Sequence, residues 1–131
     1  MRIIIDGMNV IGSRPDGWWR DRPAARRALV ASLRGLAGLG DEITVVFDGN
    51  PRPGEIEDAS AVGIDARFAP GGPDAADRAI AALVAGLSSE HPSSELLVVT
   101  SDDALAREVR ASGARTEGSG TFRSRLPRSE A

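Results

Sequence analysis

Three strongly apolar segments of this chain each end at or just before an aspartate, and helical patterns separate them. The segments cover residues 3–5, 43–47 and 96–99. Runs of Ile, Val and Leu without polar interruption are typical of strands that are covered on both faces. Strands that alternate with helices indicate βαβ units. The sequence therefore predicts an α/β fold with a mainly parallel central sheet.

Weaker patterns supply the remaining elements. Residues 62–68 alternate between apolar and polar side chains and predict a less buried edge strand, and residues 114–117 predict a short last strand. Helices are expected at residues 23–37, 74–86 and 104–111. Loops are expected at residues 7–20 and 48–54, and a final turn or helix at 118–126. We expect one domain over residues 1–126, followed by a loose tail at 127–131.

The aspartates that follow the strands carry the strongest functional signal. Asp6, Asp48 and Asp102 follow three different strands. Because the carboxyl ends of parallel strands share one edge, we expect these carboxylates to meet in one cleft. Two unit charges ~4 Å apart repel by about 4 kcal/mol at an effective dielectric near 20, so such a cluster favours a bound cation. A hard divalent metal such as Mg²⁺ suits oxygen ligands of this kind.

Three further aspartates extend the predicted acidic group. Asp74 and Asp77 lie three residues apart at the start of a predicted helix and face the same way, and Asp103 follows Asp102. Each aspartate also has a purely structural interpretation, because Asp favours turns and caps helices. Their joint placement after strands of one edge favours the metal site.

Asn9 stands close to the first aspartate of the group. Gly7 is expected to let the backbone turn sharply after the strand, which would return the Asn9 amide to the side of Asp6. There it would act as a neutral ligand or a hydrogen-bonding group. A turn-forming asparagine is the structural alternative.

The composition excludes several kinds of chemistry. The chain has no Lys, Cys or Tyr and a single histidine, His91, in a loop-like segment where we expect it to be exposed. A P-loop lysine, a Schiff base, a thiolate nucleophile, a zinc–thiolate site and a tyrosine acid are therefore excluded. The net charge of −3 means that any nucleic-acid contact must be local. With no disulfides, signal peptide or membrane-length apolar run, we expect a cytoplasmic protein.

The segment Asp6-Gly-Met-Asn9 resembles the first motif of NYN domains, in the YacP-like branch of the PIN-like ribonuclease superfamily. The similarity extends over nearly the whole chain, through residues 46–49, 76–80, 98–102 and 118–122. The resemblance implies a three-layer α/β/α domain and a Mg²⁺- or Mn²⁺-dependent ribonuclease, an endonuclease acting on RNA phosphodiesters. No C-terminal RNA-binding extension of larger relatives is expected here. The residues that match the acidic pocket are Asp6, Asn9, Asp48, Asp77 and Asp102, with Asp74 and Asp103 as further candidate ligands.

One or two metal ions in such a pocket would activate water for in-line attack at phosphorus. No protein nucleophile is then required, which suits this composition.

Two groups of arginines are candidates for contact with single-stranded RNA. Guanidinium groups suit phosphate, and tryptophan stacks unpaired bases. We expect one of two adjacent tryptophans to pack its loop onto the following helix while the other stays exposed. Arg78 could pair with an acid or reach a phosphate, and we expect the pairing. The candidates are Arg14, Trp18, Trp19, Arg20 and Arg22 in the first group, and Arg123, Arg125 and Arg128 in the second.

Other α/β proteins fit less well. A haloacid-dehalogenase-type phosphatase would need an aspartate where Met8 stands, a phospho-receiver domain needs a lysine, and a dinucleotide-binding fold needs a glycine fingerprint after the first strand. We therefore expect no nucleotide cofactor. A PIN-like domain that binds RNA or protein without cutting is the main alternative, and a toxin nuclease is another. The sequence leaves open whether the substrate is mRNA, rRNA, tRNA or single-stranded DNA, where it is cut, how many metal ions bind and the oligomeric state.

Overall fold

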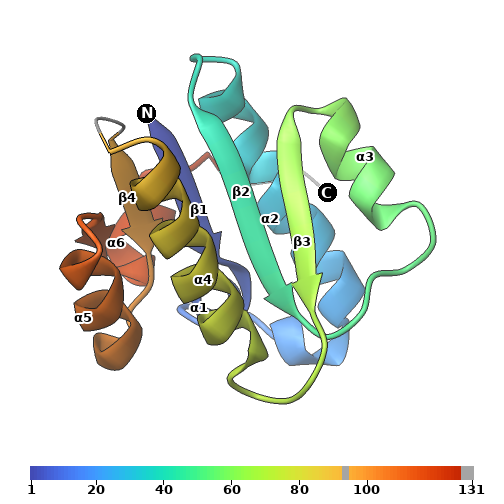
Figure 1. Cartoon of the computed structure of the whole chain (residues 1–131). Coiled ribbons are helices and arrows are strands. Elements are labelled where there is room, and N and C mark those ends of the chain that lie inside the picture. The colour runs from blue at the N-terminus through green and yellow to red at the C-terminus, as the bar shows by residue number, and fades with distance from the viewer. Residues whose placement is uncertain (93–94, 128–131) are drawn as a thin grey trace.

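The protein is described by a computed structural model that covers residues 1–92 and 95–127. Its centre is a five-stranded sheet in the order β3-β2-β1-β4-β5, and every neighbouring pair is parallel (Figure 1). The α/β fold with a parallel sheet is therefore confirmed. The strands are β1 (Arg2–Asp6), β2 (Glu42–Asp48), β3 (Ile64–Ala69), β4 (Leu96–Val99) and β5 (Arg115–Glu117).

The two helical layers follow from the alternation of side chains along the central strands. In β1, Ile3 and Ile5 face one core, while Ile4 faces the other. All three are almost fully buried, because a central parallel strand is covered on both faces. The first core is covered by α1 (Gly7–Ile11), α2 (Arg22–Ala37), α3 (Glu55–Ala61) and α6 (Ser119–Ser124), and the second by α4 (Ala75–Glu90) and α5 (Asp103–Ala111).

The expected loop after the first strand is wrong in part. It contains the short helix α1 and a 3₁₀ turn at Trp18–Arg20. A five-residue helix has little stability of its own. Here Val10 and Ile11 are buried in the first core, so tertiary packing holds the helix.

One further helix and several boundaries differ from the sequence expectation. Helix α3 was not expected, although the acidic residues of its first turn suit a helix N-terminus. It displaces the start of the edge strand from residue 62 to Ile64. Helix α4 continues to Glu90 instead of ending near residue 86, because the single Gly86 costs a helix interior only about 1 kcal/mol.

Gly7 acts by close approach rather than by an unusual backbone conformation. A Cβ atom at this position would lie 2.5 Å from the ring of Phe47, and the residue is not among the glycines with positive φ. Any side chain here would push β1 and α1 away from β2. The expectation of a sharp glycine turn is therefore replaced by a packing requirement.

Of the tail expected at residues 127–131, all but Pro127 lies outside the described residues. In the part of the chain that the structure describes, no helix is long and apolar enough to cross a membrane.

Candidate acidic active site

Asp6 lies at the carboxyl end of the central strand and is nearly buried, with 5% of its surface exposed. Its Oδ2 accepts a hydrogen bond of 2.9 Å from the hydroxyl of Thr100. Burial is the main cause that raises the pKa of Asp6 to about 6, and the charges of Asp77 and Asp48 raise it further, while the hydrogen bond from Thr100 lowers it. A buried carboxyl with such a pKa, close to other acids, is a typical feature of functional sites.

Asp48 comes from the neighbouring strand and contacts the start of α4. Its Oδ1 accepts a hydrogen bond of 3.1 Å from the backbone N–H of Ala76. Asp77 stands in the first turn of the same helix. Burial raises the pKa of Asp77, and the charges of Asp102, Asp74 and Asp48 raise it further. The carboxylates of β1, β2 and α4 are therefore close enough to repel one another.

Asp102 caps α5, as its structural interpretation predicted. Its Oδ1 accepts a hydrogen bond of 2.8 Å from the backbone N–H of Leu105. With Asp74 and Asp77 it lines a cavity of about 600 Å³ between α4 and α5. Asp6 and Asp48 are not among the lining residues, and Asp103 is exposed outside the cavity. Asp6 is therefore buried outside the open acidic cavity, although the charge of Asp77 still adds to its raised pKa.

The amide of Asn9 joins three segments near this edge. Its Oδ1 accepts hydrogen bonds from the backbone N–H of Ser101, at 2.9 Å, and from the hydroxyl of Ser119. The Ser101 hydroxyl in turn accepts from the backbone N–H of Ser119 at 2.9 Å. Oδ1 of Asn9 already accepts two hydrogen bonds. Of the two expected roles, the structure favours the hydrogen-bonding group over the metal ligand.

The donor set suits a hard cation held through water. Among the described residues, no three His, Cys, Asp or Glu side chains stand close enough to surround one metal ion. Mg²⁺ does not require that arrangement, because it is usually bound by one or two carboxylates and keeps several waters. In the described residues, Oδ2 of Asp48 and Oδ2 of Asp102 have no hydrogen-bond partner. These oxygens are available to accept hydrogen bonds from the waters of such an ion.

The order of these motifs along the chain matches a known family. The model of the YacP-like NYN domain matches residues 3–131. The chain belongs to the YacP-like NYN domain family. Its fold is similar to the crystal structure of a tryptophan-to-leucine mutant of Rae1 (YacP) from Bacillus subtilis, with a TM-score of 0.70 and 22% sequence identity over 90% of this chain and 69% of that one. The search of curated proteins found no match.

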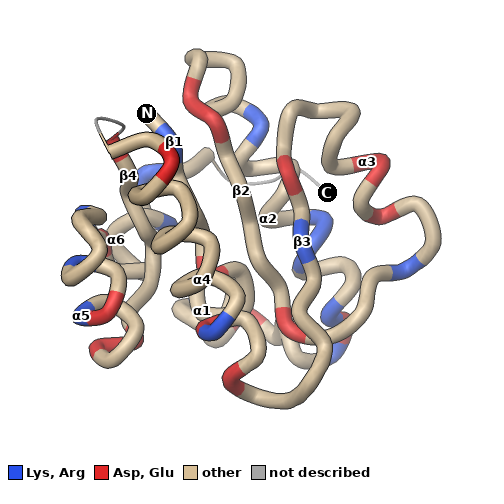
Figure 2. The backbone as a smooth tube through the Cα atoms, in the orientation of Figure 1, with Lys and Arg blue, Asp and Glu red and all other residues tan. Residues whose placement is uncertain are grey.

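In this YacP-like domain the acidic positions are spread over both edges of the sheet and several helices, and the arginines lie on helices and strands alike (Figure 2). Arg14 and Arg123, which the sequence assigned to different groups, lie together beside α2. Arg125 instead forms a two-pronged ion pair with Glu117, with N–O distances of 3.0 and 2.9 Å.

The two tryptophans divide as expected. Trp18 is partly buried and packs against the first core, whereas Trp19 is 50% exposed. The rings meet edge to face, with centroids 5.9 Å apart. Arg20 lies over Trp19 and Arg22 over Trp18, at 5.9 and 5.2 Å from the ring centroids. Trp19 with Arg20 is therefore the exposed pair of this group.

Arg78, His91 and Arg128 are the other residues that the sequence singled out. Arg78 lines the acidic cavity, and its charge lowers the pKa of Asp77. It forms no ion pair with a carboxylate of the described residues, so the expected pairing is wrong. His91 is exposed at the end of α4, as expected. Arg128 lies outside the described residues.

Sequence reasoning missed three residues of this edge. Thr100 and Ser119 lie inside the segments that carry the family resemblance, but no pattern marked their hydroxyls as partners of Asp6 and Asn9. Glu108 is a further acid that lines the cavity. It comes six residues after Asp102, about 1.7 helical turns, so helical spacing did not mark it.

Proposed function

We propose that this YacP-like domain is a metal-dependent ribonuclease, an endonuclease that hydrolyses RNA phosphodiester bonds at the acidic edge of its sheet. The observation that carries the proposal is the placement of Asp77 and Asp102 on one cavity, with Asp48 close enough for its charge to add to the pKa of Asp6 and of Asp77, which burial raises most. Membership of the YacP-like NYN family supports it. We further propose that the protein acts in the cytoplasm and needs no nucleotide cofactor.

The residues that would hold Mg²⁺ or Mn²⁺ are the acids of the open cavity, Asp77 and Asp102, with Asp74 beside them and Asp48 behind. When bound, the ion would supply charge to a phosphate oxygen and acidity to a water molecule. Asp103 and Glu108 belong to α5, the helix that Asp102 caps.

The chain's own residues set up this arrangement. Thr100 holds one oxygen of the Asp6 carboxyl in place. Without a cation the pKa of Asp6 is about 6, close to neutral pH. A bound cation would favour the ionised form of this carboxyl. The N-termini of α4 and α5 hold one oxygen each of Asp48 and Asp102, which orients the other oxygen.

The proposed substrate is RNA in single-stranded form. Trp19 is an exposed ring on which a base can stack, with Arg20 beside it for phosphate. Arg22 covers the other tryptophan and Arg125 is paired with Glu117, so both contribute mainly to structure.

The test compares cleavage and binding of one labelled single-stranded RNA. Wild-type protein is incubated with Mn²⁺, with Mg²⁺ or with EDTA, and the 5′ ends of the products are mapped. Asp102→Asn should nearly abolish cleavage. Because Asn keeps an oxygen that can cap α5, this change removes the charge while leaving the helix cap. RNA affinity should survive or rise, since a negative charge facing phosphate is lost.

A matched control separates the site from general charge effects. Asp58→Asn removes one exposed carboxylate of α3, outside the acidic edge, and should cleave at the wild-type rate. If Asp102→Asn cuts as fast as wild type, the proposed site is wrong. If wild type binds RNA but never cuts with either metal, the domain is a non-catalytic RNA-binding member of its family.

A further inference from the structure

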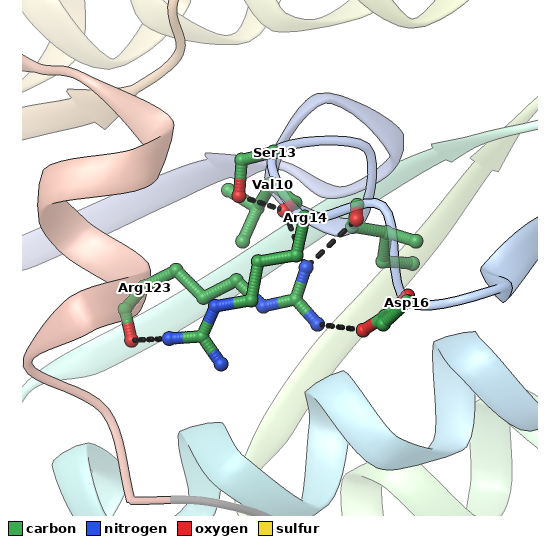
Figure 3. A network of polar contacts seen from close by, with 6 residues as sticks. Val10, Ser13, Arg14, Asp16 and Arg123 are labelled. Carbon is green, nitrogen blue, oxygen red and sulfur yellow. Dashed lines mark hydrogen bonds and ion pairs between the residues drawn. The ribbon is translucent and has the colours of Figure 1, made fainter.

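Arg14 and Arg123 lie over one cavity, although 108 residues of chain separate them. The cavity has a volume of about 320 Å³ and is lined by the loop after α1, by α2 and by the end of α6. Figure 3 shows the two side chains passing each other, each with its guanidinium group reaching the segment from which the other comes. Ser32 of α2 adds a hydroxyl, and Asp16 adds the one carboxylate of the lining.

Arg123 is fixed in position by the backbone of α1. One guanidinium nitrogen, Nη1, donates to the carbonyls of Val10 and Ile11, at 3.1 and 2.7 Å. The other, Nη2, donates to Oδ2 of Asp16 at 3.0 Å. Burial lowers the pKa of Arg123, the charge of Asp16 opposes this, and the charge of Arg14 adds to the lowering. The positive charge of Arg14 is therefore close enough to affect the pKa of Arg123.

In the part of the chain that the structure describes, most N–H donors of the Arg14 guanidinium have no hydrogen-bond partner. An arginine carries five N–H donors. Within residues 1–92 and 95–127, the guanidinium of Arg14 makes one hydrogen bond, from Nη2 to the carbonyl of Arg123 at a long 3.5 Å, and no ion pair. The one carboxylate of the lining, Asp16, pairs with Arg123, and its side chain is 48% exposed. The cavity therefore carries excess positive charge.

We propose that this cavity binds one phosphate group of a nucleic-acid strand, held by Arg14 and Arg123 with the hydroxyl of Ser32. Planar guanidinium groups match the geometry of phosphate oxygens and make charge-assisted hydrogen bonds to them. A bound anion would also offset the repulsion between the two cations. That the phosphate belongs to a polynucleotide rests on the proposed function, whereas phosphate binding itself does not.

Helix α6 connects this cavity to the segments of the acidic edge. Ser119, the first residue of α6, contacts Asn9, and Arg123 in the last turn of α6 contacts Ile11. The arginine cavity lies beside α2 and α6, which cover the first core, whereas the acidic cavity lies between α4 and α5, which cover the second. A strand with one phosphate in the arginine cavity would therefore be anchored at a distance from the cut bond.

The test is a calorimetric titration of the full chain in EDTA, where no metal-dependent cleavage takes place. The probes are inorganic phosphate and two short single-stranded RNAs of one sequence, with either a 5′-phosphate or a 5′-hydroxyl. Arg14→Gln should weaken the binding of phosphate about tenfold or more, as expected for the loss of charge-assisted hydrogen bonds. Ser32→Ala should weaken it less. Arg34→Gln removes an exposed arginine of the same helix α2 outside this cavity and is the control.

The two RNA probes distinguish the sources of the phosphate. A loss in Arg14→Gln that affects the 5′-phosphorylated RNA alone assigns the cavity to a strand terminus. An equal loss for both RNAs assigns it to an internal phosphodiester. In either case, phosphate should shift the NMR signals of the Arg14 side-chain N–H and of the backbone amides of residues 12–16 in the wild-type protein.

The proposal is overturned if neither Arg14→Gln nor Ser32→Ala changes phosphate binding relative to Arg34→Gln, or if phosphate shifts signals elsewhere. The NMR mapping needs no variant and so decides the matter even where a variant folds poorly. Cleavage without binding at this cavity would remove the anchor and leave the proposed function intact. Binding here in a protein that never cuts would support the anchor and remove the nuclease.

Discussion

The hydroxyl of Thr100 donates a hydrogen bond of 2.9 Å to Oδ2 of Asp6, and thereby joins the ends of two neighbouring strands. The same hydroxyl oxygen accepts a hydrogen bond of 3.1 Å from the backbone N–H of Asp102. Thr100 is 3% exposed, so both bonds are shielded from water. One buried side chain thus couples the central carboxyl of the site to the start of α5.

Thr100→Val should uncouple the two strand ends. The change keeps the shape of the side chain but leaves a buried carboxyl and a backbone N–H with one partner fewer, which costs about 1–3 kcal/mol in the free energy of unfolding. The pKa of Asp6 should rise above about 6, because the hydrogen bond from Thr100 lowers it. Urea unfolding and NMR titration of the carboxyl measure the two effects. Thr44→Val, in another buried strand position with a longer bond of 3.4 Å, is the control and should cost less.

Asp6 should make the metal-free protein less stable as the pH rises. The pKa of Asp6 is about 6 in the folded protein, and we take the reference value of 3.8 for the unfolded chain. Between these two pH values the folded protein binds more protons than the unfolded one. The stability therefore falls as the pH rises from about 4 to 6, by about 3 kcal/mol at 1.36 kcal/mol per pKa unit. Asp6→Asn should flatten this slope. Unfolding in EDTA at a series of pH values measures the difference, and equal slopes in the two proteins would contradict it.

Divalent metal should stabilise the folded protein. A cation that binds the native carboxylates alone raises the free energy of unfolding by about 2.7 kcal/mol when its concentration is 100 times its Kd. Melting with millimolar Mn²⁺ or Mg²⁺ should therefore show a higher midpoint than with EDTA. Asp77→Asn should reduce the gain, whereas Asp58→Asn should preserve it. A wild-type midpoint that does not respond to metal would argue against a metal site.

The two adjacent tryptophans should respond differently to truncation. Trp19→Ala should weaken the binding of single-stranded RNA by about 1–3 kcal/mol with little change in stability, because the ring is 50% exposed. Trp18→Ala should lower stability, because its ring packs against the first core. Affinity and thermal melting are measured on both variants. If Trp18→Ala and Trp19→Ala lose RNA affinity equally, although only Trp18→Ala is less stable, then bases do not stack on Trp19.

Arg26 should be the most stabilising arginine of the fold. It forms a buried ion pair with Glu55, at 2.6 and 2.9 Å, and lies over the ring of Phe68. Arg26→Met would leave the carboxylate of Glu55, 12% exposed, without its cation, which costs about 3–5 kcal/mol. Arg27→Met, at the next and exposed position, should change stability by less than about 0.5 kcal/mol. Denaturant midpoints of the two variants decide between these expectations.

Much of the fold was predictable because its signals are local. The Ile, Val and Leu runs of β1, β2 and β4 mark strands buried on both faces, and the alternation of β3 marks an edge strand. Short helices were less predictable. Helix α1 contains a glycine and two β-branched residues and depends on the burial of Val10 and Ile11 for its stability.

By itself, the sequence determined that carboxylates would stand at the ends of parallel strands, because strand direction and residue position follow from hydrophobic patterning. The tertiary structure decided what surrounds each of them. Burial and the hydroxyl of Thr100 set the pKa of Asp6, and helix N-termini hold Asp48 and Asp102. It also brought Arg14 and Arg123 to one cavity. Contacts of this kind join segments far apart in the chain, and no local pattern encodes a partner that only folding brings near.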